Sequence, residues 1–154
     1  MRRDVRYVLP ALAVALVFMF PPACREMGVF IESRYFPILA RQVVGDIERT
    51  ADKLCWRRDG LKLRSKIAAE WHGVVTDGVT SNPTSIFDAV SGQPLAPVYN
   101  TAGQSFTRHV CIEVPPWATP STRLVVRSWA VYPGWYDLWT VTVPNPDVVS
   151  EGAP

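Results

Sequence analysis

The first pattern in the chain is an uncharged run of 18 residues, from Tyr7 to Cys24 (YVLPALAVALVFMFPPAC). As a helix this run reaches roughly 27 Å, close to the ~30 Å hydrocarbon core of a bilayer. The run follows the basic segment MRRDVR, and basic flanks are retained in the cytoplasm. The pattern therefore predicts a cytoplasmic stub and transmembrane signal anchor over residues 1–24, with the rest of the chain outside the cytoplasm.

Two other fates of this N-terminus stay open. Signal peptidase requires small residues at the last and third-last positions before the cut, and Ala23 fits this pattern whereas Pro21 does not. Bacterial lipoprotein signals resemble Leu-Ala-Gly-Cys, which PPAC matches only at Ala23 and Cys24. Cys24 is thus either a thiol at the outer membrane boundary or a candidate lipidation site.

The second pattern is a helical stripe in the segment 33–54. Its apolar residues recur at spacings of three and four, as on one face of a helix. They are Phe36, Leu39, Val43, Ile47, Ala51 and Leu54. The pattern predicts an amphipathic helix from about residue 37 to 53, within a linker that spans residues 25–53. Its stripe is expected to pack on the domain's sheet, with self-association through residues 36–54 or contact with the membrane as alternatives.

The third pattern is strict alternation in LKLRSKIAAEWHGVV, residues 61–75. Odd positions are apolar and most even positions are polar, which indicates a strand with one buried face. Asp59-Gly60 before it is a favoured two-residue hairpin turn. The segments RLVVRSWAVY and WYDLWTVTV, joined by Pro133-Gly134, predict a final hairpin.

Many Gly, Pro, Ser and Thr residues punctuate the rest of the chain. The segment 76–106 predicts a long connection with short strands near residues 86–90 and 95–99. The β domain is expected over residues 54–144, followed by a flexible tail over 145–154. The predicted fold class is mainly β, a small sandwich-like antiparallel domain preceded by a transmembrane helix and an amphipathic linker helix.

The alternation also orients two cysteines. Cys55 falls on the polar face of its strand, and Cys111 lies opposite the apolar set of Val110 and Ile112 in TRHVCIEVP. In an oxidising compartment these two cysteines are the natural disulfide pair, on the outside of the main core. Closing a loop of this length stabilises the fold by about 4 kcal/mol on the chain-entropy model.

Composition adds limits on partners. A net charge of +2 is too near neutral to indicate a nucleic-acid partner, while 48% hydrophobic residues provide for a substantial core. One candidate surface is a basic patch that faces anionic head groups. It consists of Arg57, Lys62, Arg64 and Lys66. The second candidate surface is an aromatic platform for a ligand, although such residues more commonly pack in a core. It consists of Trp129, Tyr132, Trp135, Tyr136 and Trp139.

No catalytic motif stands out. His72 and His109 with nearby carboxylates suggest a metal site or hydrolase, but HExxH, CxxC and GxSxG spacings are missing. We expect no catalytic residue, no metal and no cofactor.

The predicted function is that of a non-enzymatic, membrane-anchored module at the cell envelope. It is expected in the inner membrane, with its C-terminal domain in the periplasm, where it contacts another envelope protein or itself. The layout also resembles that of pilin-like subunits, although MRRDVRYVLP lacks their Gly-then-Glu processing region. An envelope hydrolase or metal-dependent enzyme that uses His72 and His109 is the remaining alternative.

Overall fold

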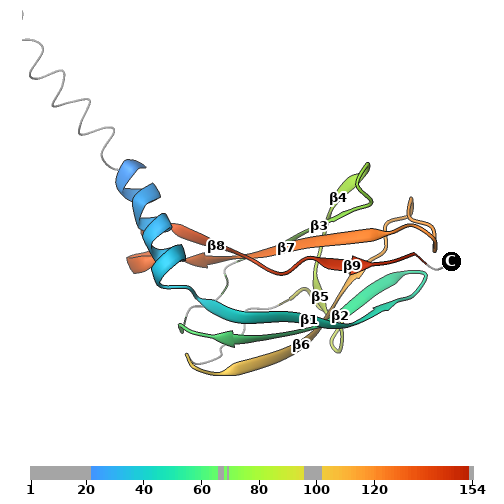
Figure 1. The fold of residues 1–154 in the computed structure, drawn as a ribbon, viewed down its shortest axis with the longest axis horizontal. Coiled ribbons are helices and arrows are strands. Elements are labelled where there is room, and N and C mark those ends of the chain that lie inside the picture. The colour runs from blue at the N-terminus through green and yellow to red at the C-terminus, as the bar shows by residue number, and fades with distance from the viewer. Residues whose placement is uncertain (1–21, 66–67, 69, 96–101, 153–154) are drawn as a thin grey trace, which may run out of the picture.

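Two antiparallel sheets face each other, and a helix lies at one end of them (Figure 1). This arrangement comes from a computed structural model that describes residues 22–65, 68, 70–95 and 102–152. The prediction of a mainly β, sandwich-like domain is confirmed. The predicted membrane span, residues 7–24, lies outside the described residues except for its last three. Within the described part of the chain, no helix is long and apolar enough to cross a bilayer.

The first sheet has the strand order β1-β2-β6-β5. Its strands are β1 (Leu39–Arg49), β2 (Lys53–Lys62), β6 (Ser105–Glu113) and β5 (Phe87–Asp88). The second sheet has the order β4-β3-β7-β8, and β9 also pairs with β7. Its strands are β4 (Ser81–Thr84), β3 (Glu70–Thr76), β7 (Leu124–Pro133), β8 (Thr140–Pro144) and β9 (Val148–Ser150). A short 3-10 helix, η1 (Trp135–Asp137), lies between β7 and β8.

The core lies between the two sheets and has two parts. The larger cluster joins Leu54 and Ile112 of the first sheet to Val75 and Val126 of the second. The smaller cluster lies toward the helix and includes Tyr132. Because side chains alternate along a strand, each strand contributes every second residue to these clusters.

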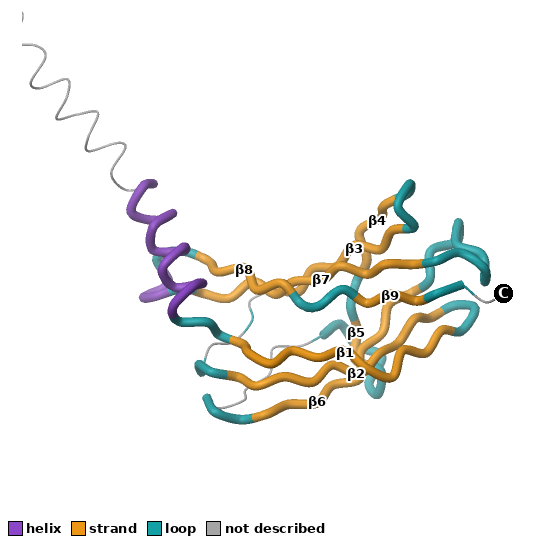
Figure 2. The backbone as a smooth tube through the Cα atoms, viewed as in Figure 1, coloured by secondary structure: helices purple, strands orange, loops and turns teal. Residues whose placement is uncertain are grey.

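The helix occupies residues 22–35, before the segment where the sequence predicted one. Arg25, Glu26 and Met27 are good helix formers, and Pro37 ends the helix because the residue before a proline is disfavoured in the helical region. The helix lies against the end of the sandwich where η1 and β8 meet (Figure 2). The opposite end carries the β1–β2 turn and β9.

The predicted helix over residues 37–53 is wrong, because this segment forms β1 and the start of β2. Two bulges, between Ala40 and Val43 and between Gly45 and Glu48, each insert one extra residue opposite β2. The bulges break the two-residue alternation and leave apolar positions at wider spacings. A strand with two bulges therefore resembles a helix in its pattern.

The predicted turn at Asp59-Gly60 is also wrong, because β2 runs straight through both residues. Gly60 pairs with Phe106 of β6, and the Phe106 ring covers it so closely that a Cβ there would lie 2.6 Å from Cζ. An aromatic ring over a strand glycine replaces the missing side chain. Because β2 is straight, its inward face continues past the apolar Leu54 and Trp56. It then carries two charged residues, Arg58 and Lys62.

Two further expectations change. The alternating stretch 61–75 is divided between the end of β2 and β3, with Trp71 and Val75 on the inner face. The predicted flexible tail 145–154 contains β9, because Val148 fills the core and its strand pairs with β7. The final hairpin is confirmed as β7 and β8, although its connection is longer than Pro133-Gly134.

Candidate functional site

The helix is fixed to the sandwich by a buried carboxylate, that of Glu32. One oxygen, Oε2, accepts hydrogen bonds from Nε1 of Trp139 at 2.8 Å and from the backbone N–H of Trp135 at 3.0 Å. The other oxygen accepts a hydrogen bond from Nη1 of Arg64 in a salt bridge. The side chain of Glu32 is fully buried. We call these four residues the helix junction.

The local sequence makes this close approach feasible. Gly28 lies one helical turn before Glu32 and therefore on the same face. A Cβ at Gly28 would lie 2.7 Å from the Trp139 ring, so only glycine lets the ring reach the helix. Phe36 extends the contact, with its ring centroid 5.1 Å from that of Trp135.

Electrostatics keep the carboxylate of Glu32 ionised. Burial by itself raises the pKa of this group, but the hydrogen bonds from Arg64, Trp139 and Trp135 outweigh it and hold the pKa below its ordinary value. A buried charge is tolerated only when it is paired and hydrogen-bonded. The junction therefore fixes the helix to one end of the domain through specific hydrogen bonds.

The five aromatic residues of the predicted platform lie in different places. Trp135 and Trp139 belong to the helix junction. Tyr132 is buried in the core, Trp129 stacks on His72 with ring centroids 5.7 Å apart, and Tyr136 is exposed. The structure does not bring these residues together on one surface.

The predicted basic patch does not form one face either. Arg57 points outward and forms salt bridges with Asp46 and Asp59. Lys62 lies on the inner face of β2 and is buried. Arg64 bonds to Glu32, and Lys66 lies outside the described residues. The cause is the straight course of β2, which puts Lys62 on the inner face with Trp56, whereas a turn at Asp59-Gly60 implied that Lys62 faces outward with Arg57.

The two histidines lie on opposite outer faces of the sandwich. His72 is on β3 of the second sheet, next to Glu70 at 3.0 Å, on the face away from Trp71 and Val75. His109 is on β6 of the first sheet, on the face away from the buried residues of that strand. The core separates them, so they do not form one site. In the described ranges, no group of three His, Cys, Asp or Glu side chains is placed to hold a metal ion.

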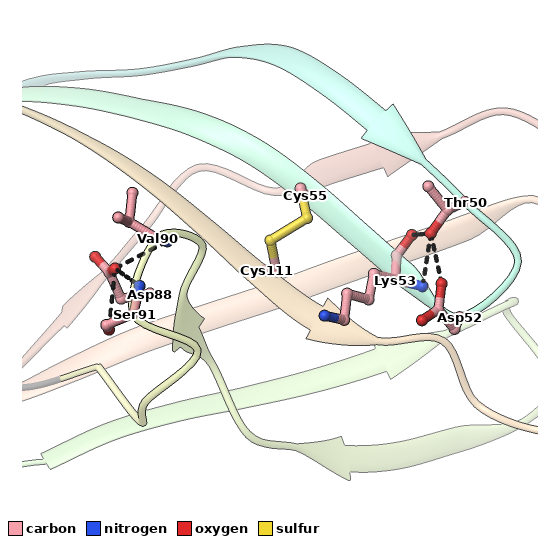
Figure 3. Close-up of a disulfide and its surroundings, with 8 residues drawn as sticks. All are labelled: Thr50, Asp52, Lys53, Cys55, Asp88, Val90, Ser91 and Cys111. Atoms are coloured by element: carbon pink, nitrogen blue, oxygen red, sulfur yellow. Dashed lines mark hydrogen bonds between the residues drawn. A yellow bond between two sulfur atoms is a disulfide. The ribbon is translucent and has the colours of Figure 1, made fainter.

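The predicted disulfide between Cys55 and Cys111 is confirmed. The two residues are direct partners in the β2–β6 register, on the side away from the core residues Leu54 and Ile112 (Figure 3). The bond thus links β2 and β6, the two central strands of the first sheet, on the side away from the core. Cys24 lies in the helix as a half-exposed free thiol.

Sequence reasoning missed two important residues. Glu32 stands in a stretch without a clear period, and only its spacing of four from Gly28 marks it. Arg58 was missed because the expected turn at Asp59-Gly60 placed it at the end of a strand, although it lies in the middle of β2. A comparison with protein-family models finds no match to the chain, and neither does a comparison with curated proteins.

Proposed function

We propose that the protein is a membrane-tethered module of the cell envelope that acts by binding and not by catalysis. Its N-terminal segment would span the inner membrane, and its sandwich would stand on the periplasmic side, where it contacts another envelope protein. The observation that carries the proposal is the helix junction. It connects the sandwich to the helix over residues 22–35, which begins within the last three residues of the uncharged run 7–24.

The distribution of exposed apolar side chains supports a membrane-facing end. Of the eleven exposed large hydrophobic side chains described, six lie on the helix, just after it, or at η1. They are Met27, Phe30, Tyr35, Phe36, Tyr136 and Leu138. Aromatic residues with a polar tip are typical of the membrane–water interface. This end of the sandwich would therefore rest on the head groups, with the β1–β2 turn pointing away.

The disulfide supports an extracytoplasmic location. Disulfides persist in oxidising compartments and are rare in the cytoplasm. Cys55 and Cys111 face each other across neighbouring strands, which favours their pairing once the compartment is oxidising.

The two alternatives have less support. The pilin-like reading relied on an amphipathic helix over residues 36–54, and that segment is strand instead. The hydrolase reading relied on His72 and His109 acting together, and they lie on opposite faces.

Fractionation of a bacterium that produces the full chain tests the proposal. Alkaline phosphatase, which is active only outside the cytoplasm, would be fused after residue 154. We expect active reporter in a membrane pellet that resists carbonate extraction. The matched control lacks residues 1–21 and should give inactive reporter in the soluble fraction. An inactive reporter or a carbonate-soluble full chain would contradict the tethered orientation.

A further inference from the structure

The interior of the first sheet changes from apolar to cationic along its length. Trp56 of β2 pairs with Val110 of β6, and both are buried in the main core. The next inward pair along the same strands is Arg58 opposite Arg108. Like charges directly opposite each other on adjacent strands are destabilising. The carboxylate of Asp88 supplies negative charge near Arg108, whereas the side chains that act on the pKa of Arg58 are Tyr132 and Arg108.

Arg58 is the most deeply placed of these cations, with 3% of its surface exposed. Its guanidinium lies between two rings, 5.0 Å from the centroid of Trp71 and 5.5 Å from that of Phe106. Nη2 donates a hydrogen bond of 2.7 Å to Oε1 of Gln42. The buried Nε has no hydrogen-bond partner.

A second buried donor in the same place is also unpaired, the indole Nε1–H of Trp71. Buried donors in proteins are nearly always hydrogen-bonded, so unpaired donors on two contacting side chains indicate a missing acceptor. Arg58 and Trp71 both line one cavity of about 30 Å³. The two residues that carry the unpaired donors thus also line the cavity.

The lining of this cavity defines its chemistry. Three cations and one phenol supply its polar part, and Leu39, Ala68 and Phe106 supply an apolar wall. The polar residues besides Trp71 are Arg58, Lys62, Arg108 and Tyr132. Among the described residues that line it, none is Asp or Glu. The cavity is far smaller than the roughly 300 Å³ of a drug-sized pocket, so it suits a small anionic group.

The electrostatic state of these groups agrees with this picture. Burial lowers the pKa of Arg58 to about 10, and it lowers the pKa of Lys62, with Arg108 adding to both effects. A pKa of about 10 leaves Arg58 charged at neutral pH. Burial raises the pKa of Tyr132 despite the two arginines, so its hydroxyl keeps a proton to donate.

We propose that this cavity binds a small carboxylate, whose two oxygens accept hydrogen bonds from Nε of Arg58 and Nε1 of Trp71. The carbon attached to the carboxylate would contact the apolar wall at Leu39 and Phe106. A free short-chain acid and the C-terminal end of a peptide share this chemistry. The inference does not depend on the membrane tether and goes beyond the proposed function.

Fluorine NMR of the full chain in phosphatidylcholine nanodiscs, labelled with 5-fluorotryptophan, tests the site. The signal that disappears in Trp71→Phe identifies Trp71. We expect this signal to shift saturably with sodium butyrate, and not with butyramide or with sodium chloride at equal ionic strength. Acetyl-dialanine with a free carboxylate, compared with its amide, represents the C-terminal end of a peptide. Tighter binding of acetyl-dialanine than of butyrate indicates a peptide end, and the reverse order indicates a free acid.

Variants are then compared by calorimetry, which measures their affinity for butyrate or acetyl-dialanine, whichever binds the natural chain more tightly. Arg58→Met should weaken binding at least about tenfold, which corresponds to the loss of ~1.4 kcal/mol. Trp71→Phe keeps an aromatic side chain but removes the N–H donor, and it should weaken binding less. Arg127→Gln is the control, since Arg127 is an exposed arginine of β7, and it should bind as the natural chain does.

Three results would overturn the carboxylate assignment. The first is a Trp71 signal that neither carboxylate moves. The second is an equal response to chloride, which would indicate a cavity that holds a halide ion or water only. The third is unchanged affinity in both Arg58→Met and Trp71→Phe, and the second of these variants decides if the first does not fold.

Discussion

At the scale of single residues, Glu32 is the side chain that sets how the helix meets the domain. Its carboxylate accepts hydrogen bonds from Arg64, Trp135 and Trp139, which come from two parts of the chain that are far from Glu32 in sequence. Charge-assisted hydrogen bonds in a buried place are stronger than those between neutral groups. The ionised form of one residue therefore holds the junction together.

Acid should release this junction. The pKa of Glu32 in the folded protein lies below its ordinary value of 4.5, so its stabilising contribution is complete above that value. The contribution is lost as the pH falls through the lower pKa of the folded state. Glu32→Gln should lower the free energy of unfolding at neutral pH by about 1–3 kcal/mol and reduce its dependence on pH below 4.5.

Urea unfolding of the full chain in nanodiscs, followed by tryptophan fluorescence at several pH values, measures this difference. Glu26→Gln is a matched control, because Glu26 is on the same helix and exposed. The control should behave like the natural chain. If both variants show the same loss, the hydrogen bonds of Glu32 are not what holds the helix.

At the scale of elements, the pairing of β2 with β6 depends on a glycine. Gly60 is buried under the Phe106 ring, and that ring also covers the guanidinium of Arg58. A side chain at position 60 would displace the ring and disturb both contacts. The same glycine explains why β2 continues where the sequence indicated a turn.

Gly60→Ala should therefore destabilise the domain by about 1–3 kcal/mol, the usual cost of overpacking a core. Gly45→Ala is the control in the neighbouring β1, since a Cβ there would meet first the movable Nη2 of Arg57, at 3.1 Å. We expect the control to change stability by less than about 0.5 kcal/mol. Thermal unfolding compares the two variants, and equal effects would contradict the role of the Phe106 ring.

Alternation predicted the disulfide correctly, although it failed over residues 61–75, which it indicated as a single strand. The pairing of Cys55 with Cys111 followed from strands whose alternation is unbroken around each cysteine. The segment 37–53 was misread because its bulges occur at Arg41 and Asp46, non-glycine residues with φ of 50° and 48° that carry no glycine-like signal. The partners of Glu32 are distant in sequence, so no local pattern reveals the junction.

At the scale of the whole molecule, the two ends of the sandwich differ in chemistry. One end carries the helix junction, most of the exposed large hydrophobic side chains described and the cationic cavity. The larger core cluster and the β1–β2 turn lie farther from the helix. A tether at the first end would place the cavity close to the membrane and leave the other end free for a partner.

The oxidation state of the three cysteines tests the proposed location of the domain. We expect the membrane-extracted protein to have the mass of the full chain, with one alkylated thiol before reduction and three after it, because only Cys24 is free. The double variant Cys55→Ala, Cys111→Ala should unfold with a free energy lower by about 4 kcal/mol, since the loop between the two positions is no longer closed.

Intact mass spectrometry with alkylation before and after reduction shows whether the N-terminal segment is retained and whether the disulfide has formed. A chain that begins at Cys24 and carries the extra mass of a diacylglycerol would mean that Cys24 is the lipid anchor and that the spanning segment is removed. The helix over residues 22–35 would then lie directly at the lipid surface, and the partner would be sought at that lipoprotein's membrane. Three free thiols without reduction would instead place the domain in a reducing compartment and contradict the proposed location.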